Sequence, residues 1–452
     1  MNIQLSETIV AQATAPGVGA ISVIRLSGPK AIQLADKAFY GKSLLEAASH
    51  TIHFGTIRDE HGQILDEVLV SLFVAPRSYT REHVVEISCH GSPYIVQQVL
   101  QYLIRLGARM ANPGEFTLRA FLNGAMDLSQ AEAVADLIAS NSAASHSIAM
   151  QQMRGGFSNE IQALRQELID FASLIELELD FSEEDVEFAD RGQLATLVEK
   201  IRKLLNALID SFQLGNVIKE GVSTVIAGRP NAGKSTLLNA LLNEERAIVS
   251  EIAGTTRDTI EEILNIRGIQ FRLIDTAGIR DASDQIEAIG VEKTMQKIQA
   301  SSLLVYVYDA ADLSEVEVAE DLKKLERENL KALVIANKSD LTDQAPQAEN
   351  WLSISAKEGI NVHQVKEALY KAVVNHEIAL DQTVVANVRH YDALQSSDRS
   401  LETVLHGLQS GISGDLVAMD IRHALRHLGE ITGEISTDDL LGNIFSRFCI
   451  GK

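Results

Sequence analysis

The feature that most constrains this chain is a loop of the form Gly-x-x-x-x-Gly-Lys-Ser at residues 228–235. The apolar run 222–227 before it is typical of a buried strand, and the apolar run 237–242 after it predicts a helix. In this context the glycines let backbone N–H groups turn inward around phosphates, and the helix N-terminus adds the positive end of its dipole. Lys234 would contact the β and γ phosphates, and the Ser235 hydroxyl would bind Mg²⁺. The alternative, a glycine-rich turn that fits by accident, is disfavoured by the flanking strand and helix.

Two further motifs follow strand-like runs and indicate guanine as the base. Residues 337–340 read Asn-Lys-Ser-Asp, and the carboxylate of Asp340 can accept both the N1–H and the exocyclic amine of guanine. The sequence Ser-Ala-Lys at 355–357 would support the guanine O6. Adenine lacks this donor pair, and a buried acceptor left unpaired costs about 1–3 kcal/mol, which is sufficient for selectivity.

A fourth motif, Asp-Thr-Ala-Gly at 275–278, has the form Asp-x-x-Gly. Its aspartate can hold Mg²⁺ through water, and its glycine N–H can sense the γ-phosphate.

The runs 271–274, 303–308, 332–336 and 351–354 are almost continuously apolar, which indicates a parallel sheet covered on both faces. Four such motifs in one α/β unit resemble the Ras-like GTPases. The predicted GTP-binding residues are Asn231, Ala232, Gly233, Lys234, Ser235, Thr236, Ser250, Glu251, Ile252, Ala253, Gly254, Thr255, Thr256, Asp275, Thr276, Ala277, Gly278, Asn337, Lys338, Ser339, Asp340, Ser355, Ala356 and Lys357.

Residues 249–258 lie between the Gly-x-x-x-x-Gly-Lys-Ser loop and the Asp-x-x-Gly motif, where switch I is expected. Thr256 is the predicted Mg²⁺ ligand of the triphosphate state. Ras-like GTPases usually carry a glutamine directly after Asp-x-x-Gly that orients the attacking water. This chain has Ile279 there, which cannot do so. Either hydrolysis is slow or another residue substitutes. The candidates are Arg280, Asp281, Asp284 and Glu287, each of which could equally be an ordinary charge of a switch loop.

The chain has 452 residues, more than one core supports, so we expect two to four domains. Residues 1–118 combine strand-like runs with a helical pattern, which predicts a small α+β domain. Residues 119–215 and 379–452 show helical patterns without strand signals, whereas 216–378 alternate strand and helix. Because the segment 379–452 is too small for its own core, we expect it to pack against 119–215, with the α/β domain inserted between them. The expected elements outside the GTPase domain are strands at 21–26, 51–57, 67–74 and 84–88, helices at 95–106 and 193–214, and a helix face formed by Leu164, Leu168, Phe171 and Ile175.

The net charge of −22 makes non-specific nucleic-acid binding unfavourable, because phosphates repel an acidic surface. Any contact with RNA would then use a local basic patch or a partner protein. The two cysteines, Cys89 and Cys449, predict no disulfide framework and fit a reducing cytosol. The first residues lack the features of a signal peptide, and no apolar run approaches the roughly 18 residues that span a bilayer. We therefore expect a cytoplasmic protein without a membrane segment.

Three further stretches make the whole chain similar to the MnmE family of tRNA-modification GTPases, also called TrmE. They are Thr-Ile-Val-Ala-Gln-Ala-Thr at 8–14, Pro-Gly-Glu-Phe-Thr-Leu-Arg-Ala-Phe-Leu-Asn at 113–123, and Phe-Ser-Arg-Phe-Cys-Ile-Gly-Lys at 445–452. The resemblance implies an N-terminal tetrahydrofolate-binding domain that forms a homodimer, a discontinuous helical domain and an inserted GTPase domain. It also implies a heterotetramer with the FAD-dependent partner MnmG (GidA).

The chemistry implied by the resemblance is modification of tRNA at carbon 5 of the wobble uridine. An aminomethyl or carboxymethylaminomethyl group would be added there. Its one-carbon unit would come from 5-formyl- or methylene-tetrahydrofolate, and ammonium or glycine would supply the amine.

The resemblance further implies that two GTPase domains pair across the nucleotide when K⁺ is bound. The implied K⁺ ligands are Asn231, through its side-chain oxygen, and the loop of Ser250, Ile252 and Thr255, with carbonyls of the first two. The ion would take the place of an arginine finger and offset the developing phosphate charge. Glu287 matches the catalytic glutamate of the family, which positions the attacking water and would account for the missing glutamine.

For folate, the family pattern points to Arg25, Glu86 and Lys452. Glu86 could accept hydrogen bonds from the pterin ring, and the two cations suit the carboxylates of a folate. From the residues alone, Arg25 could equally be a charge at a strand end, Glu86 a solvated edge residue and Lys452 part of a frayed tail. Position 125 departs from the family, because Ala125 stands where a basic residue usually contacts the folate. Folate would bind more weakly, or another residue would compensate.

Three other side chains have open readings. Cys449 could be a nucleophile, a redox thiol or a small buried hydrophobe, and the resemblance favours a functional role. His423 and His427 have the spacing of two metal ligands on a helix, but no third ligand is evident, so we do not expect a metal there.

Two alternative functions stay open. A regulatory GTPase of ribosome assembly, which binds RNA and modifies nothing, would have a similar GTPase domain but no need of the N-terminal domain or the Cys449 tail. A folate-dependent aminomethyl-transfer protein with an accessory GTPase differs mainly in emphasis.

Overall fold

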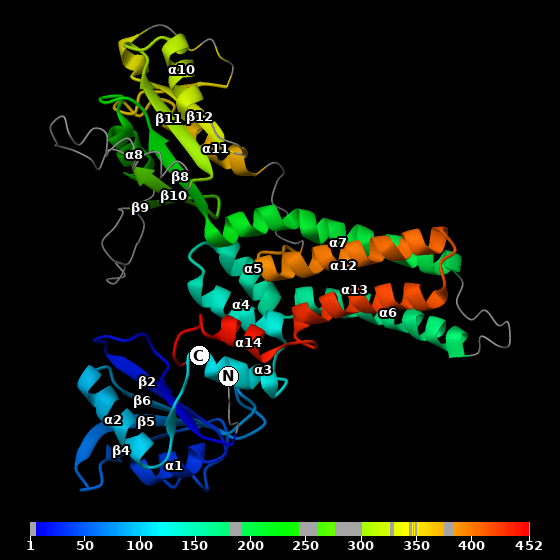
Figure 1. Ribbon diagram of the computed structural model, residues 1–452. Coiled ribbons are helices and arrows are strands. Elements are labelled where there is room, and N and C mark those ends of the chain that lie inside the picture. The colour runs from blue at the N-terminus through cyan, green and yellow to red at the C-terminus, as the bar shows by residue number, and fades with distance from the viewer. Residues whose placement is uncertain are drawn as a thin grey trace. The chain divides into compact units, whose positions relative to one another are not determined.

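The computed structural model describes residues 6–180, 191–243, 261–275, 301–325, 330–342, 346, 348, 350–374 and 383–451 (Figure 1). The chain divides into two compact units. Unit 1 contains Met1–Ile138, Met150–Arg202 and Ser396–Lys452, and unit 2 contains Ala139–Ala149 and Lys203–Gln395.

Unit 1 begins with a seven-stranded sheet in the order β3-β4-β5-β6-β2-β1-β7. All neighbours are antiparallel except β1 and β7. Alternate strand residues such as Ile24, Val70 and Ile87 are fully buried and form one core with the helices α1 and α2. The elements are β1 (Ile9–Gln12), β2 (Ile21–Ser27), α1 (Ala31–Ala38), β3 (Phe39–Tyr40), β4 (Thr51–Arg58), β5 (Ile64–Phe73), β6 (Val84–His90), α2 (Pro93–Arg105) and β7 (Arg109–Met110).

The opposite face of this sheet is apolar and exposed at β4 and β5. Phe54 and Leu69 are cross-strand neighbours there, and their exposed fractions are 68% and 47%. Ile52, on the same face of β4, is 66% exposed. Nearer β1 the same face is covered, because Ile9 and Ala11 pack with Phe116. The sheet therefore has one open apolar region and one region where a helix supports the strands.

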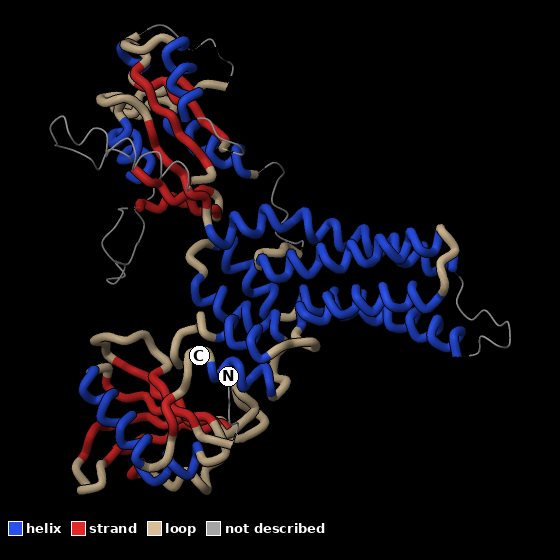
Figure 2. The backbone as a smooth tube through the Cα atoms, viewed as in Figure 1, coloured by secondary structure: helices blue, strands red, loops and turns tan. Residues whose placement is uncertain are grey.

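The rest of unit 1 is helical (Figure 2). Helix α13 packs along α6, and Arg202 of α7 forms a two-pronged ion pair with Asp398 of α12, with an Nε–Oδ1 distance of 2.8 Å. Leu164, Leu168 and Ile175 are buried as predicted for one helix face of α6, whereas Phe171 is only half-buried. The helices are α3 (Glu115–Leu122), α4 (Leu128–Ala139), α5 (Ala143–Met153), α6 (Gly156–Asp180), α7 (Arg191–Glu220), α12 (Val388–Gln409), α13 (Gly414–Thr432) and α14 (Asp438–Phe445), of which α4, α5, α7 and α12 continue into unit 2.

Unit 2 is built on a six-stranded sheet in the order β13-β12-β11-β8-β10-β9. Five strands are parallel, as predicted from the apolar runs. Strand β9 pairs antiparallel with β10 at the edge and is not among the strands predicted from the apolar runs. Helices α8 and α11 pack against one side in a large core, and α10 covers Tyr306 and Tyr308 on the other. The elements are β8 (Val222–Ala227), α8 (Lys234–Asn243), β9 (Glu261–Ile266), β10 (Ile269–Asp275), β11 (Leu303–Asp309), α10 (Glu315–Leu325), β12 (Lys331–Asn337), η3 (Ser339–Leu341), β13 (Leu352–Ser353) and α11 (Val362–Val373).

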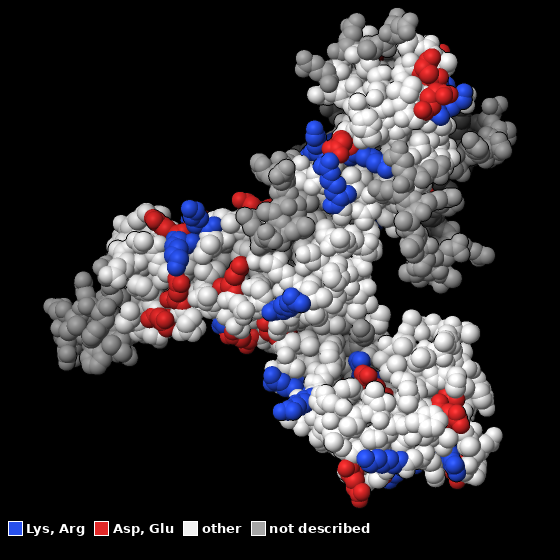
Figure 3. All heavy atoms as spheres, turned by 180° about the vertical axis from the view of Figure 1, so that it is seen from behind, with Lys and Arg blue, Asp and Glu red and all other residues white. Residues whose placement is uncertain are grey.

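The charged side chains that the structure describes are spread over the face drawn in Figure 3. On the face shown in Figure 3, lysine and arginine occur in small groups mixed with aspartate and glutamate. No helix in the described ranges is both long and apolar enough to cross a membrane.

Candidate functional site

The loop at residues 228–235, called the phosphate loop after its predicted role, follows β8 directly. Two of its glycines cannot be replaced. Gly228 has φ +149°, and a Cβ there would overlap the carbonyl oxygen of Val307. Gly233 has φ +91°, and a Cβ there would overlap the side-chain amide of Asn337. Both residues therefore need the conformational freedom and the small size of glycine. Helix α8 begins at Lys234, earlier than the apolar pattern predicts, so the loop ends at a helix N-terminus.

The side chain of Lys234 folds back over this loop. Its Nζ donates to the carbonyls of Gly228 and Arg229, each at 2.9 Å. The ammonium is therefore placed beside the backbone turn that would surround phosphates. Phosphate oxygens would offer it stronger, charge-assisted partners than these two neutral carbonyls. Ser235, the next residue, starts the helix partly exposed.

Asn337 connects this loop to the two motifs predicted to contact guanine. Its side chain is buried, its Nδ2 donates to the Ala232 carbonyl at 2.8 Å, and its Oδ1 accepts from the Ala356 N–H at 3.0 Å. The Ser339 N–H donates to the Ile354 carbonyl at 3.0 Å. The loops after β8, β12 and β13 are thereby held together at the carboxyl ends of parallel strands, where α/β folds bind ligands.

The side chains around Asp340 favour its ionised form. A hydrogen bond from Ser355, with smaller contributions from Lys357 and Lys338, holds the pKa of Asp340 below its ordinary value. An ionised carboxylate is a pure acceptor, as recognition of two guanine donors requires. Lys338 has φ +64°, and its Nζ bonds Asp309 at 2.5 Å. Lys357 is exposed beside Glu358.

Several predicted residues lie outside the described part of the chain. They include all of the switch I positions and the predicted residues after Asp275. Asp275 itself ends β10, but its side chain is not described. Their roles stay predictions. The positions are Ser250, Glu251, Ile252, Ala253, Gly254, Thr255, Thr256, Thr276, Ala277, Gly278, Ile279, Arg280, Asp281, Asp284, Glu287 and, at the end of the chain, Lys452.

A second polar cluster lies on the supported face of the sheet in unit 1. Arg25 of β2 and Glu86 of β6 are cross-strand neighbours, and Arg25 Nε bonds Glu86 Oε1 at 2.8 Å. The guanidinium carbon of Arg25 lies 5.4 Å from the Tyr79 ring centroid and 5.7 Å from that of Phe116. Arg25 Nη1 also approaches the Gly451 carbonyl at 3.4 Å. The pair is 18% and 27% exposed, so solvent still reaches it.

Helix α3 and the chain terminus frame this cluster. The Tyr79 hydroxyl bonds Thr117 Oγ1 at 2.8 Å, and burial raises the pKa of Tyr79. Gly451 has φ +99° and packs so closely on the Gln12 carbonyl that a Cβ would overlap it. Arg25 and Glu86 were predicted from the sequence, whereas Tyr79 and Phe116 were not, because only the folded sheet and helix bring the two rings to the Arg25 cation. A cation, a carboxylate and two aromatic faces suit a flat heteroaromatic ligand that carries hydrogen-bond donors.

Ala125 lies shortly after the end of α3, Cys449 lies two positions before Gly451, and the two residues offer different chemistry. The Ala125 N–H donates to the Ala120 carbonyl at 2.7 Å. Its methyl side chain has no polar atom to offer a ligand. Cys449 carries an exposed free thiol. Its backbone carbonyl accepts a hydrogen bond from the Gly114 N–H at 3.4 Å. Cys89, by contrast, is buried, and burial raises the pKa of its thiol to about 11, which makes it unreactive.

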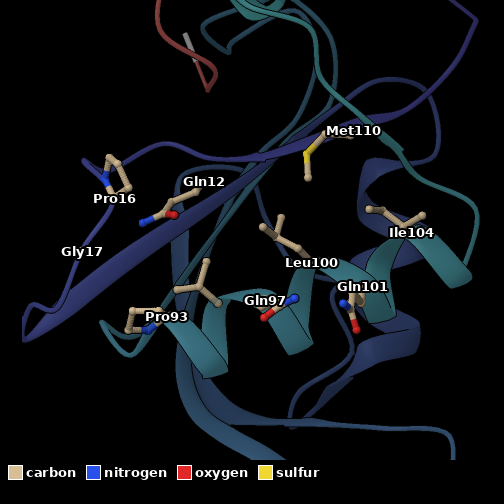
Figure 4. Close-up of a pocket in the computed structure, with 10 residues that line it drawn as sticks. Gln12, Pro16, Gly17, Pro93, Gln97, Leu100, Gln101, Ile104 and Met110 are labelled. Atoms are coloured by element: carbon tan, nitrogen blue, oxygen red, sulfur yellow. The ribbon is translucent and has the colours of Figure 1, made fainter.

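Two other features carry no catalytic chemistry. A hollow of about 370 Å³ lies between α2 and the segment after β1 (Figure 4). Its polar groups are amides, with no titratable side chain. No group of three or more histidine, cysteine, aspartate or glutamate side chains that could hold a metal occurs among the described residues. The pocket is lined by Gln12, Pro16, Gly17, Pro93, Val96, Gln97, Leu100, Gln101, Ile104 and Met110.

Matches to known proteins extend over the whole chain. The family models described as "GTP-binding protein TrmE N-terminus" and "MnmE helical domain" match residues 8–125 and 128–449. A protein of Cytophaga hutchinsonii named tRNA modification GTPase MnmE is 56% identical over 99% of this chain and 98% of its own length. The relative of that name from Christiangramia forsetii is 53% identical over 100% of both chains.

Among solved structures, that of Aquifex aeolicus Era is 26% identical over 40% of this chain and 66% of its own, with a TM-score of 0.27. The two full-length relatives and the two family models agree with each other. The chain therefore belongs to the MnmE family of tRNA modification GTPases.

Proposed function

We propose that this chain binds GTP with Mg²⁺, hydrolyses it to GDP and phosphate, and uses this hydrolysis in tRNA modification. The observation that carries the proposal is the buried Asn337 side chain, which joins the phosphate loop to the loop at Ala356. Lys234 and Ser235 would contact the phosphates and Mg²⁺, and Asp340 would select guanine. The names of the full-length relatives support the same function.

Hydrolysis is proposed to need K⁺ and pairing of two GTPase domains. Asn231 is exposed at the tip of the loop with φ +60°, a position open to an ion and to a second copy of the chain. Together with Ser250, Ile252 and Thr255 it would complete the K⁺ shell. Glu287 would position the attacking water.

The folate part of the proposal concerns the Arg25–Glu86 cluster. A bound tetrahydrofolate would supply the one-carbon unit. Glu86 would accept from donors of its pterin ring, and the aromatic faces of Tyr79 and Phe116 fit a ring of that shape. Arg25 and Lys452 would provide positive charge. Because Arg25 already pairs with Glu86, the ligand would compete with an ion pair that water still reaches.

The domain organisation proposed for this function has three parts. Residues 1–118 would bind folate and form the homodimer, and the exposed apolar region at Phe54 and Leu69 offers a surface for that contact. Residues 119–215 with 379–452 would form the helical domain, and 216–378 the GTPase domain. The FAD-dependent partner MnmG would join in the cytoplasm, and tRNA would meet the assembly there. Given the mixed charges of Figure 3, MnmG would contribute to holding the tRNA.

One experiment separates modification from a ribosome-assembly role. The wobble uridine of tRNA is analysed by mass spectrometry in cells that lack the gene, in cells with the gene restored, and in cells that carry the Lys234→Ala variant. We expect the modified nucleoside to disappear in the first and third cases and to return in the second. An unchanged nucleoside profile in the deletion would favour the ribosome-assembly GTPase.

A further inference from the structure

The turn at residues 123–125 has no cation of its own, but a cation from another loop lies against it. Arg81, between β5 and β6, donates from Nη1 to the Asn123 carbonyl at 3.1 Å. In return, Asn123 Nδ2 donates to the Thr80 carbonyl at 2.7 Å. A Cβ built on Gly124 would lie 3.4 Å from Arg81 Nη1. The guanidinium is therefore in contact with the backbone that immediately precedes Ala125.

The backbone of Arg81 is strained in this position. Its φ is +58°, in the left-handed region that favours glycine. Its side chain is exposed, and within the described residues it forms no ion pair. The only polar contact of its side chain that the structure gives there is the neutral Asn123 carbonyl. Its positive charge therefore remains available to an anion.

The same loop also reaches the Arg25–Glu86 cluster. Tyr79 stacks under Arg25 and bonds Thr117 on α3, whereas Arg81 contacts Asn123 at the end of α3. Thr117 and Asn123 are six positions apart, which corresponds to about 9 Å along a helix. The loop thus runs along α3 with an aromatic ring near one end and a cation near the other. This arrangement suits an extended ligand with a ring and a distal anion.

We propose that Arg81 supplies the cation that position 125 lacks and binds a carboxylate on the glutamate of a folate. The proposal rests on the proposed folate binding and extends it to a residue outside the family pattern. Arg81 holds the anionic end, and the cluster at Glu86 holds the ring. A planar guanidinium suits this role, because it can bind both oxygens of one carboxylate.

The test compares two probes by isothermal titration calorimetry on the full-length protein. One is 5-formyl-tetrahydrofolate, and the other is the corresponding tetrahydropteroate, which lacks the glutamate. The variant Arg81→Gly removes the cation and relieves the backbone strain, and Arg81→Gln keeps a donor near Asn123 without the charge. We expect each variant to weaken the folate complex about five- to tenfold and to leave the pteroate complex unchanged.

A second cation provides the rescue, and a neighbouring arginine provides the control. Adding Ala125→Lys to Arg81→Gly moves the charge back to position 125 and should restore the preference for folate over pteroate. Arg77→Ala removes an exposed arginine of the same loop and should change neither affinity. The role of Arg81 is overturned if either Arg81 variant keeps the wild-type preference, if both probes weaken equally, or if lysine at 125 restores nothing. If the wild-type protein binds neither probe, the proposed folate function itself fails.

Discussion

Asn337 and Ala232 are 105 positions apart in the sequence, and their hydrogen bond of 2.8 Å joins the loop predicted to recognise the base to the loop predicted to bind phosphate. The Asn337 amide also accepts from the Ala356 N–H, so one buried side chain sets the distance between three loops. Gly233 lies so close to this amide that no larger residue fits there. The site is therefore partly preorganised before a nucleotide binds, which reduces the cost of ordering it.

Replacing Asn337 should separate these loops. Asn337→Ala leaves the Ala356 N–H and the Ala232 carbonyl without their partner, which costs about 1–3 kcal/mol for each buried group. We expect the affinity for a fluorescent GDP analogue to fall by at least tenfold and the melting temperature of unit 2 to decrease. Asn239→Ala, on the exposed face of α8, is the control and should change neither. An Asn337→Ala variant with wild-type affinity would contradict this role.

Gly228 makes the closest backbone approach in the phosphate loop. Gly228→Ala would force the loop away from the Val307 carbonyl, so we expect loss of nucleotide binding together with a lower melting temperature. The matched control is Gly359→Ala, which also has a positive φ, +72°, but open space around its Cβ position. It should cost only the backbone strain of about 1 kcal/mol. Equal effects of the two variants would show that the close approach at Gly228 is unimportant.

The local parts of the fold could be predicted because each depends on neighbouring residues. The apolar run before the phosphate loop matches β8, Val222–Ala227, and the runs before Asn337 and Ser355 end the strands that position these residues. Parallel strands then bring their carboxyl ends to one edge of the sheet. The edge strand β9 escaped prediction, since three of its six residues are polar and alternate poorly with the others.

The long-range parts of the sites could not be predicted in the same way. Arg25 and Glu86 meet because the register of β2 and β6 places them opposite one another, 61 positions apart. Arg81 reaches Asn123 only through a left-handed backbone that no local rule assigns to arginine. On α6, Ala172 is buried and Phe171 is not fully buried, because the buried face turns slightly from the predicted one.

A buried charge network in unit 1 predicts a dependence of stability on pH. Burial opposes ionisation of Glu115, but bonds from Arg109, the Asn112 N–H and Arg119 together hold its pKa below the ordinary value. A lowered pKa contributes stability above the unfolded-state value of about 4.3 that is lost as the pH falls through the folded-state value. Glu115→Gln should therefore destabilise unit 1 by about 3–5 kcal/mol at neutral pH.

Urea denaturation followed by circular dichroism across pH 3–7 provides the measurement. The difference between wild type and Glu115→Gln should shrink as the pH falls through the lowered pKa of the folded state, where the wild-type carboxylate becomes protonated. The control is Glu167→Gln, whose ion pair with Lys200 is exposed and should contribute less than about 1 kcal/mol. A difference that stays constant over the whole range would show that ionisation of Glu115 does not stabilise the fold.

Asp340 should determine the choice of base. Asp340→Asn replaces an acceptor by a group that also donates, so it loses one guanine partner and gains a match to the additional carbonyl of xanthine. We expect the ratio of the Kd values for GTP and xanthosine triphosphate to change by at least a hundredfold in favour of xanthosine. Lys357→Ala, at an exposed residue of the neighbouring loop, serves as a milder comparison and should weaken both ligands without inverting the preference. An Asp340→Asn variant that still prefers GTP would refute this assignment.

Hydrolysis should depend on Glu287 and on K⁺ through separate steps. Glu287→Ala removes the proposed water-positioning carboxylate, so kcat should fall by about 10²–10⁴-fold while GTP affinity stays unchanged.

Asn231→Ala should instead reduce the acceleration by K⁺, because it removes a proposed ligand of the ion. Turnover is measured as phosphate release in K⁺ and in Na⁺ at equal ionic strength. The assignments fail if Glu287→Ala turns over normally or if wild-type hydrolysis is equally fast in both ions. Asp284→Ala tests the nearby alternative and should retain most of the activity, because its carboxylate is not the one that matches the family's catalytic glutamate.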